Sequence, residues 1–236
     1  SILISKNYFA NNQGYTLYVT DAEDSVTIDE CTFIDYQKNS ICINDTQNDI
    51  LISNCTFESS RIVDNLCSIY AKTNSSFIML NVFYINNEQD NNVDYTVYCY
   101  CTKSFIVENF SSNSGGIYII PSSPITEQVK LFNASIKNCN YGFFFQPANE
   151  IQGIFSLLIA ECNFSSVKHA LFLTMKNSKS TIKNNTICNC INFDEDPNKS
   201  PFIEIKIDSD ESLMNFVFDE FIFERNKYLD LLVELD

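Results

Sequence analysis

The groups that usually carry enzymatic chemistry are present in this sequence, but no catalytic motif brings them together. His169 is the only histidine, and no nearby Ser or Cys has the context of a nucleophile, so we expect a surface or strand-end side chain. Polysaccharide cleavage needs carboxylates that converge on one face. The outward acidic residues Asp29, Glu108 and Asp219 fall several repeats apart. We therefore predict no catalytic residue, and an enzyme is the alternative rather than the main interpretation.

Metal-binding patterns are also missing from the sequence. The spacings Cys99-x-Cys101 and Cys188-x-Cys190 are not the Cys-x-x-Cys pairs of zinc sites. The acidic stretches 194–197 and 208–211 match no defined Ca²⁺ loop and are expected to be solvated turns. We predict no metal and no cofactor. The ten cysteines leave two interpretations open, disulfides in an oxidising compartment or free thiols in a core.

The net charge and the glycosylation motifs limit the possible partners and locations of the protein. A net charge of -15 disfavours nucleic acid, and no apolar run approaches the roughly 20 residues that span a bilayer, so we expect no membrane insertion in this segment. Asn-x-Ser/Thr sites favour an extracellular or cell-surface glycoprotein. The candidate glycosylation sites are Asn44, Asn54, Asn74, Asn109, Asn133, Asn163, Asn184 and Asn198.

A repeated phrase organises the whole chain. Residues 26–33 and 50–57 share the pattern that ends in Cys-Thr-Phe, and they lie 24 residues apart. Sliding this phrase along the chain gives the anchor positions Asn7, Cys31, Cys55, Val82, Phe110, Ala134, Cys162, Asn185 and Phe221. Most intervals are 23 to 28 residues, and the last is 36. Such a unit cannot bury its own apolar residues, so we expect coils that stack on one another.

Two apolar columns flank the anchor at period two, which predicts strands rather than helices. Three residues before it stand Ile4, Ile28, Ile52, Met79, Val107, Leu131, Ile159, Ile182 and Phe218. Two residues after it stand Phe9, Phe33, Phe57, Tyr84, Ser112, Ile136, Phe164, Ile187 and Phe223. We expect both columns to face the interior, and Cys31 to lie over Cys55.

The position just before the anchor predicts a tight corner, because Asn tolerates left-handed backbone angles. This corner column contains Lys6, Glu30, Asn54, Asn81, Asn109, Asn133, Glu161, Asn184 and Glu220. Four of the candidate glycosylation sites belong to it. Those four are therefore either modified residues or structural corners that happen to precede Ser or Thr.

A second short strand in each coil presents an outward column rich in aromatic residues. The column consists of Tyr18, Cys42, Tyr70, Tyr98, Tyr118, Phe144, Phe172, Glu204 and Leu232. The candidate binding residues are its aromatic members, Tyr18, Tyr70, Tyr98, Tyr118, Phe144 and Phe172. Stacking could simply stabilise the sheet, or a loop of the same chain could cover it. Alternatively, an exposed stripe could bind a partner protein, another copy or a glycan.

The phrase Ile52-Ser53-Asn54-Cys55-Thr56-Phe57 and its copies resemble the right-handed parallel β-helix superfamily over essentially the whole chain. Within it, the sequence is most similar to large surface proteins described as polymorphic-membrane-protein-like. That resemblance implies a cell-surface or secreted protein with an adhesive or structural role, whereas pectate-lyase-like and glycosidase relatives are enzymes. The Gly-Gly-Ala-Ile phrases of the bacterial group are absent, and the nearest is Gly115-Gly116-Ile117-Tyr118.

We therefore predict an all-β fold, a parallel β-helix of about nine coils of 23–28 residues with one longer insertion. It would form one domain over 1–236, a segment of a longer chain, with a loop-rich insertion at 191–211. The main functional hypothesis is a structural or adhesive module that binds a protein or glycan through the aromatic column. The alternatives are a polysaccharide lyase or glycoside hydrolase, and a filament or scaffold component that associates through open solenoid ends.

Overall fold

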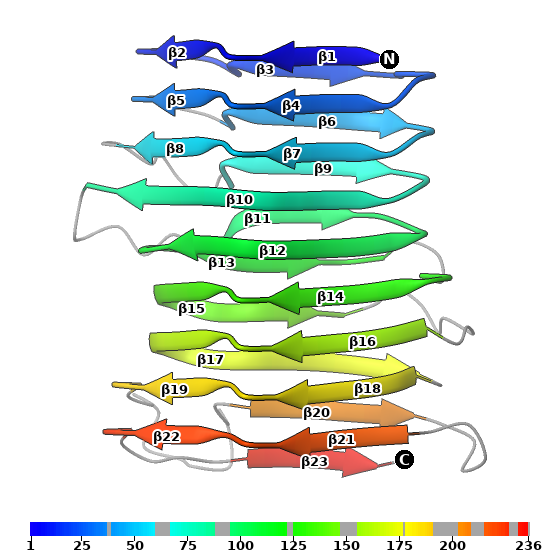
Figure 1. Ribbon diagram of the computed structural model, residues 1–236, viewed down its shortest axis with the longest axis vertical. Coiled ribbons are helices and arrows are strands. Elements are labelled where there is room, and N and C mark those ends of the chain that lie inside the picture. The colour runs from blue at the N-terminus through cyan, green and yellow to red at the C-terminus, as the bar shows by residue number, and fades with distance from the viewer. Residues whose placement is uncertain are drawn as a thin grey trace.

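The computed structural model is a stack of short parallel strands wound into a solenoid (Figure 1). The structure describes residues 1–36, 39–59, 67–87, 95–121, 125–146, 155–176, 178–190, 203–208, 215–226 and 231–235. These residues form strands and connecting turns and contain no helix. The predicted all-β parallel β-helix is therefore confirmed.

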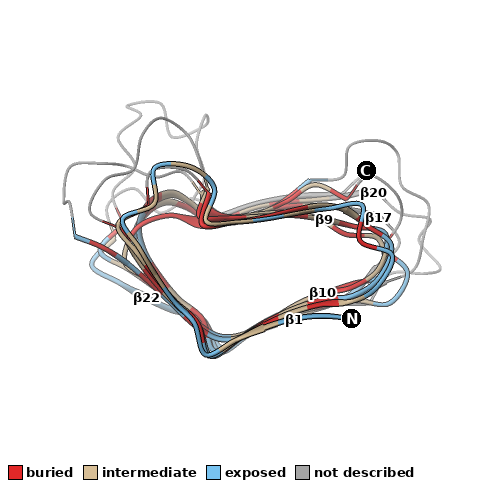
Figure 2. Cartoon of the chain, turned by 90° about the horizontal axis from the view of Figure 1, so that it is seen from above, coloured by how far each residue is buried: buried red, intermediate tan, exposed pale blue. Residues whose placement is uncertain are grey.

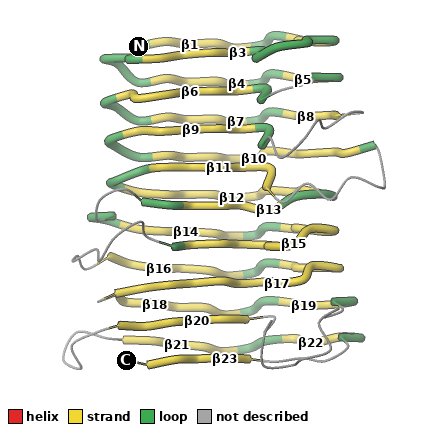
Figure 3. The backbone as a smooth tube through the Cα atoms, turned by 180° about the vertical axis from the view of Figure 1, so that it is seen from behind, coloured by secondary structure: helices red, strands yellow, loops and turns green. Residues whose placement is uncertain are grey.

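Three ladders of parallel strands make up the wall, and each coil contributes one rung to each ladder (Figure 3). The first ladder contains β1 (Ile2–Ser5), β4 (Val26–Asp29), β7 (Ile50–Ser53), β10 (Phe77–Asn86), β12 (Ser104–Ser112), β14 (Gln128–Phe132), β16 (Phe155–Ala160), β18 (Ser178–Lys183) and β21 (Asn215–Asp219). The second contains β2 (Tyr8–Ala10), β5 (Thr32–Ile34), β8 (Thr56–Ser59), the later parts of β10 and β12, the starts of β15 (Ser135–Phe145) and β17 (Asn163–Lys176), β19 (Thr186–Cys188) and β22 (Ile222–Glu224). The third contains β3 (Leu17–Thr20), β6 (Ile41–Thr46), β9 (Ile69–Thr73), β11 (Tyr95–Tyr100), β13 (Gly116–Ile119), the later parts of β15 and β17, β20 (Ile203–Asp208) and β23 (Leu231–Leu235).

The register of the ladders is the one that the sequence columns predict. Ile4 pairs with Ile28, and Ile28 with Ile52, and the same column continues without a slip to Phe218. The column that begins at Phe9 is equally continuous as far as Phe223. Residues about 24 positions apart therefore lie directly over one another.

The core is a cluster of buried side chains that lies between the three ladders. Figure 2 shows the outline that the stacked coils make when they are viewed along the solenoid. Ile28, Ile52 and Phe57 are fully buried. The rings of Phe33 and Phe57 stack with a centroid distance of 4.7 Å, so the aromatic members of an inward column pack face to face.

The corner column has left-handed backbone angles at every predicted position. Its φ values are positive at Lys6, Glu30, Asn54, Asn81, Asn109, Asn133, Glu161, Asn184 and Glu220. The corner separates the first ladder from the second, at the sharp lower vertex of the cross-section in Figure 2. Asn suits this geometry because it adopts left-handed angles more readily than most residues.

A second left-handed corner, which we did not predict, follows the ends of β2, β5, β19 and β22 and lies inside β15 and β17. It lies four residues after the anchor, at Asn11, Asp35, Asn138, Ser166, Asn189 and Arg225. Asn occupies three of these six positions but never two in succession, whereas the first corner has Asn on four consecutive coils, from Asn54 to Asn133.

The third bend needs small residues because neighbouring backbones approach closely there. A Cβ atom on Gly142 would lie 2.5 Å from the ring of Phe164 and 2.7 Å from the carbonyl oxygen of Ala170. A Cβ on Gly116 would meet the carbonyl oxygens of Tyr141 and Gly142. The Gly115-Gly116 pair therefore has a packing role.

Shortening a stacked core ring should destabilise the whole solenoid. We expect Phe57→Ala to lower the free energy of unfolding by about 3–5 kcal/mol, because it removes a fully buried ring and leaves a cavity. Urea denaturation followed by circular dichroism measures the loss. The neighbouring Thr56→Ala, on a half-buried outward side chain, should change it by less than about 1 kcal/mol. Equal losses in the two variants would contradict the inward assignment of Phe57.

Candidate functional site

Five of the predicted aromatic residues form a continuous row on the outer face of the third ladder. Tyr70, Tyr98, Tyr118, Phe144 and Phe172 come from β9, β11, β13, β15 and β17 and pair in register. Consecutive ring centroids are 5.9, 4.9, 4.2 and 4.6 Å apart. We call these five residues the aromatic ladder.

Tyr18 lies apart from the aromatic ladder. Cys42 occupies the rung between Tyr18 and Tyr70, so no ring bridges them. Tyr18 is 56% exposed and contacts Tyr15 instead, at a centroid distance of 5.4 Å. The structure thus brings together five of the six predicted binding residues.

The rings of the aromatic ladder cover one another's faces. Their interplanar angles are 11°, 29°, 23° and 6° from Tyr70 to Phe172, so each ring lies nearly parallel to the next rung. Phe144, near the end of the ladder, is buried, whereas its tyrosine neighbours and Phe172 are half-buried. The parts that remain for contact are ring edges and tyrosine hydroxyls. The stripe is therefore less exposed than its sequence suggested.

Three further tyrosines widen this surface. Tyr100 follows Tyr98 on the same face, and their hydroxyl oxygens are 3.0 Å apart. Tyr95 packs on Tyr118 with centroids 4.3 Å apart, and Tyr141 packs edge-on against Phe144 at 5.2 Å. Alternation along β11 could have revealed Tyr100. The position of Tyr95 depends on a register shift between Tyr95 and Val97, which the sequence does not signal.

The expectation for His169 was wrong. The residue lies inside β17, is only 7% exposed, and stacks on Tyr141 at 4.7 Å with nearly parallel planes. Tyr141 and His169 are register partners on adjacent rungs, so the imidazole continues an aromatic column. Its role in the described structure is packing.

Three tyrosine hydroxyls of the aromatic ladder have raised pKa values. Burial, together with the nearby Tyr100, raises the pKa of Tyr70 to about 12. Burial and the hydrogen bond to Tyr100 raise the pKa of Tyr98, and burial also raises the pKa of Tyr118. At neutral pH these three hydroxyls are therefore uncharged.

The cysteines are free thiols, mostly buried in the core. At the anchor position the Cys55 Sγ donates to the carbonyl oxygens of Ser53 (3.0 Å) and of Ile28 on the preceding coil (3.7 Å). Cys31 and Cys162 make equivalent contacts. Burial raises the pKa of the Cys55 thiol to about 12, which keeps it protonated and unreactive. Of the two interpretations of the cysteines, free core thiols are the one that the structure shows.

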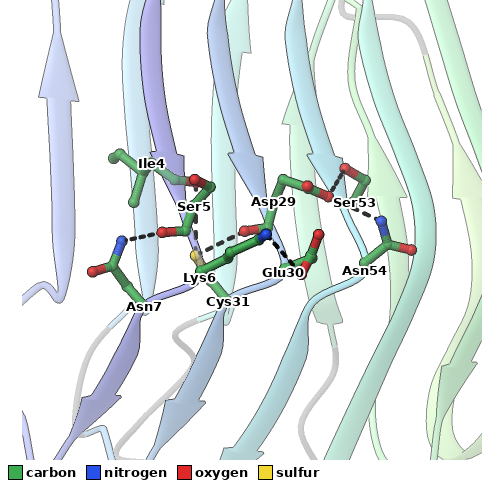
Figure 4. Close-up of polar contacts among 9 residues, drawn as sticks. All are labelled: Ile4, Ser5, Lys6, Asn7, Asp29, Glu30, Cys31, Ser53 and Asn54. Carbon is green, nitrogen blue, oxygen red and sulfur yellow. Dashed lines mark hydrogen bonds and ion pairs between the residues drawn. The ribbon is translucent and has the colours of Figure 1, made fainter.

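Two of the outward acidic residues, Asp29 and Glu108, are held in structural contacts on separate coils. Asp29 accepts hydrogen bonds from the Ser53 hydroxyl (2.6 Å) and the Asn54 amide (2.9 Å), which lower its pKa (Figure 4). Glu108 pairs with Lys130 at 2.6 Å. Within the described ranges, no group of three or more His, Cys, Asp or Glu residues could hold a metal ion. The acidic stretch 194–197 and most of 208–211 lie outside the described residues.

Asparagine amides form a hydrogen-bonded ladder along the corner column. It begins where the Asn54 Nδ2 donates to Asp29, as Figure 4 shows. The Nδ2 atoms of Asn81, Asn109 and Asn133 then each donate to the Oδ1 of the preceding corner asparagine at 2.8 to 2.9 Å. These residues thus have a structural role whether or not they are modified.

Most candidate glycosylation sites are exposed. Asn54, Asn109, Asn133 and Asn184 lie in the exposed corner, and Asn74 and Asn163 are exposed elsewhere. Asn44 is half-buried in β6 and donates to Asp45 at 2.8 Å. Asn198 and the stretches 191–202 and 209–211 of the predicted insertion lie outside the described residues, while 203–208 forms β20.

Comparison with known proteins identifies the fold family. Residues 1–146 match a family model described as the right handed beta helix region. No curated protein and no solved structure matches the chain. The described residues contain no helix long and apolar enough to cross a membrane.

The raised pKa values predict how stability depends on alkaline pH. Because the folded chain favours the neutral phenol of Tyr70, this contribution is fully present below pH 10 and is lost as pH rises towards about 12. Phenolate absorbance should show a late-titrating class of tyrosines in the folded chain, and this class should shrink in Tyr70→Phe. The same chain unfolded in urea serves as the control. Identical titration curves for the folded and unfolded chains would contradict the assignment.

Proposed function

The chain belongs to the right-handed β-helix family, and on this premise we propose that it is an extracellular or cell-surface structural module that binds a partner protein. The contact surface would be the aromatic ladder together with Tyr95, Tyr100 and Tyr141. One observation carries the proposal: a row of aromatic rings in register on one outer face, half-buried except for Phe144, with hydroxyls at its edge.

The ring geometry favours a protein over a glycan as the partner. Sugars stack on the faces of aromatic rings, but in the aromatic ladder the faces are used by neighbouring rungs. Ring edges and hydroxyls suit a protein surface, in which tyrosine contacts combine apolar area with hydrogen bonding. With a net charge of -15, association with a basic partner surface is also favoured.

Rigid display is the mechanism that the fold supports. Each side chain of the aromatic ladder is anchored in a backbone ladder, and its ring stacks on one or two neighbouring rings. Little conformational freedom is then lost on association, which improves affinity. Affinity would arise from several repeated contacts rather than from one pocket.

The enzymatic alternative gains no support from the placement of the carboxylates. Asp29 and Glu108 are engaged in hydrogen bonds and an ion pair, as described above. Glu161 and Glu220 are corner residues on coils separated by the coil of Asn184. We therefore keep binding as the proposed activity.

Removal of two central rings should weaken partner binding without unfolding the chain. We expect Tyr98→Ala combined with Tyr118→Ala to weaken affinity at least about tenfold, because tyrosines at an interface centre often dominate binding. The probes are an array of purified extracellular protein domains and a printed glycan array.

A double variant on another face provides the matched control. Tyr8 and Phe83 are 68% and 49% exposed on the second ladder, so their replacement by Ala should leave binding unchanged. The double variant Tyr98→Phe with Tyr118→Phe removes the hydroxyls but keeps the rings, so it distinguishes their contributions to binding. Binding that survives the Ala pair, binding to glycans alone, or no binding on either array would refute the proposal.

Secretion predicts a specific modification pattern. Mass spectrometry of the native protein should find glycans on exposed sites such as Asn74 and Asn163, and free buried thiols. Asn109 and Asn133 lie on adjacent rungs about 4.8 Å apart, so a single molecule should rarely carry glycans on both. Unmodified asparagine at every site would contradict an extracellular location.

A further inference from the structure

Six tyrosines are gathered on one face, although they come from four different rungs. Tyr70, Tyr95, Tyr98, Tyr100, Tyr118 and Tyr141, here called the tyrosine cluster, are all half-buried, so each keeps part of its ring accessible. Tyr118 has two close tyrosine neighbours, Tyr95 at 4.3 Å and Tyr98 at 4.9 Å between centroids. The chain has twelve tyrosines in all, so half of them meet here.

Contacting phenols have a known covalent chemistry. One-electron oxidation converts a phenol into a phenoxyl radical, whose unpaired spin resides partly on the ring carbons next to the oxygen. Two such radicals couple when those carbons come together, and this requires neighbouring rings. Most pairs of surface tyrosines in a protein are too far apart, whereas the β-helix register holds Tyr118 against two partners at once.

We propose that Tyr118 is a site of oxidative cross-linking, coupled to Tyr95 or Tyr98 as dityrosine by a peroxidase that uses hydrogen peroxide. The product is a covalent bond between consecutive coils on the outer face. This inference is independent of the partner proposed above, because it requires only the tyrosines and the oxidant.

The reaction balances with hydrogen peroxide as the oxidant. Each phenol loses one electron and one proton, and the two radicals form one carbon–carbon bond between their ortho positions. Each coupled ring then moves its ortho hydrogen to the oxygen and regains aromaticity. Peroxide accepts the two electrons and two protons and leaves as two molecules of water.

Two features of the surroundings of Tyr118 bear on this reaction. The Tyr98 and Tyr100 hydroxyl oxygens are 3.0 Å apart and share a hydrogen bond, and because the rings are half-buried, solvent water takes the proton that oxidation releases. The rings are stacked or tilted rather than edge to edge, so a ring must turn about its side-chain torsions before coupling. Because the rings are half-buried on the outside of the sheet, such a turn does not disturb the core.

Tryptic digestion can identify the link without ambiguity. Cleavage after Lys72, Lys103 and Lys130 yields peptides 73–103 and 104–130. The second peptide contains Tyr118 as its only tyrosine and has no cysteine. A covalent pair of these two peptides therefore reports a tyrosine bond from Tyr118 to the preceding coil.

The experiment treats the dilute folded chain with a heme peroxidase and hydrogen peroxide, isolates the monomer by gel filtration, and analyses its tryptic peptides. We expect dityrosine fluorescence and a 73–103/104–130 pair that is two hydrogens lighter than the sum. Tyr118→Phe keeps the ring stack and should abolish this pair. Tyr95→Phe and Tyr98→Phe then show which partner is used, by loss of most of the linked product.

Tyr8→Phe is the matched control, since Tyr8 is 68% exposed on another face, and it should leave the yield unchanged. The proposal fails if oxidised monomer contains no such pair, if the link occurs only in dimers, or if the pair persists in Tyr118→Phe. Circular dichroism of each variant confirms that the fold is retained.

Discussion

Parallel in-register pairing of the backbone is the constraint on which everything else in this molecule depends. Because each residue lies over its equivalent in the next coil, a side chain must be compatible with copies of itself above and below. Aromatic rings satisfy this condition by stacking, and amides satisfy it by donor-to-acceptor hydrogen bonds. Side chains of like charge do not satisfy it, because they repel one another on adjacent coils. In the corner column no two acidic residues are adjacent: Glu30 lies between Lys6 and Asn54, and Asn184 separates Glu161 from Glu220.

This constraint also explains which parts of the structure could be predicted from the sequence. The columns at Ile28 and Phe33 recur with the same chemical character, so their register follows from the spacing alone. The first corner is visible because Asn is frequent there. The second corner is not, because its asparagines are interrupted by Asp35, Ser166 and Arg225, which share the backbone angle but not the side-chain chemistry.

The candidate site shows the same division. Membership of the aromatic ladder follows from alternation, whereas the degree of exposure does not, since it depends on how closely the rings pack. The contacts of Tyr95 require a register shift, and the burial of His169 requires a strand that continues around a bend. Both features depend on the course of the backbone within one coil, which the spacing of the columns does not reveal. Stacking also determines which atoms of this surface a partner can contact. The faces of the rings pack against one another, and the edges of the rings remain accessible.

The buried thiols at the anchor position donate weak hydrogen bonds to the carbonyl oxygens of a corner. At the equivalent position of a later coil, Asn185 makes the bond to the preceding coil instead, because its Nδ2 donates to the Ile159 carbonyl at 3.1 Å, and its Oδ1 also accepts from the Cys162 backbone amide at 2.9 Å. The thiol thus acts here as a small buried hydrogen-bond donor that an amide can replace. No disulfide takes part in closing the coil. A wall closed by hydrogen bonds rather than by disulfides needs no oxidant to reach its architecture.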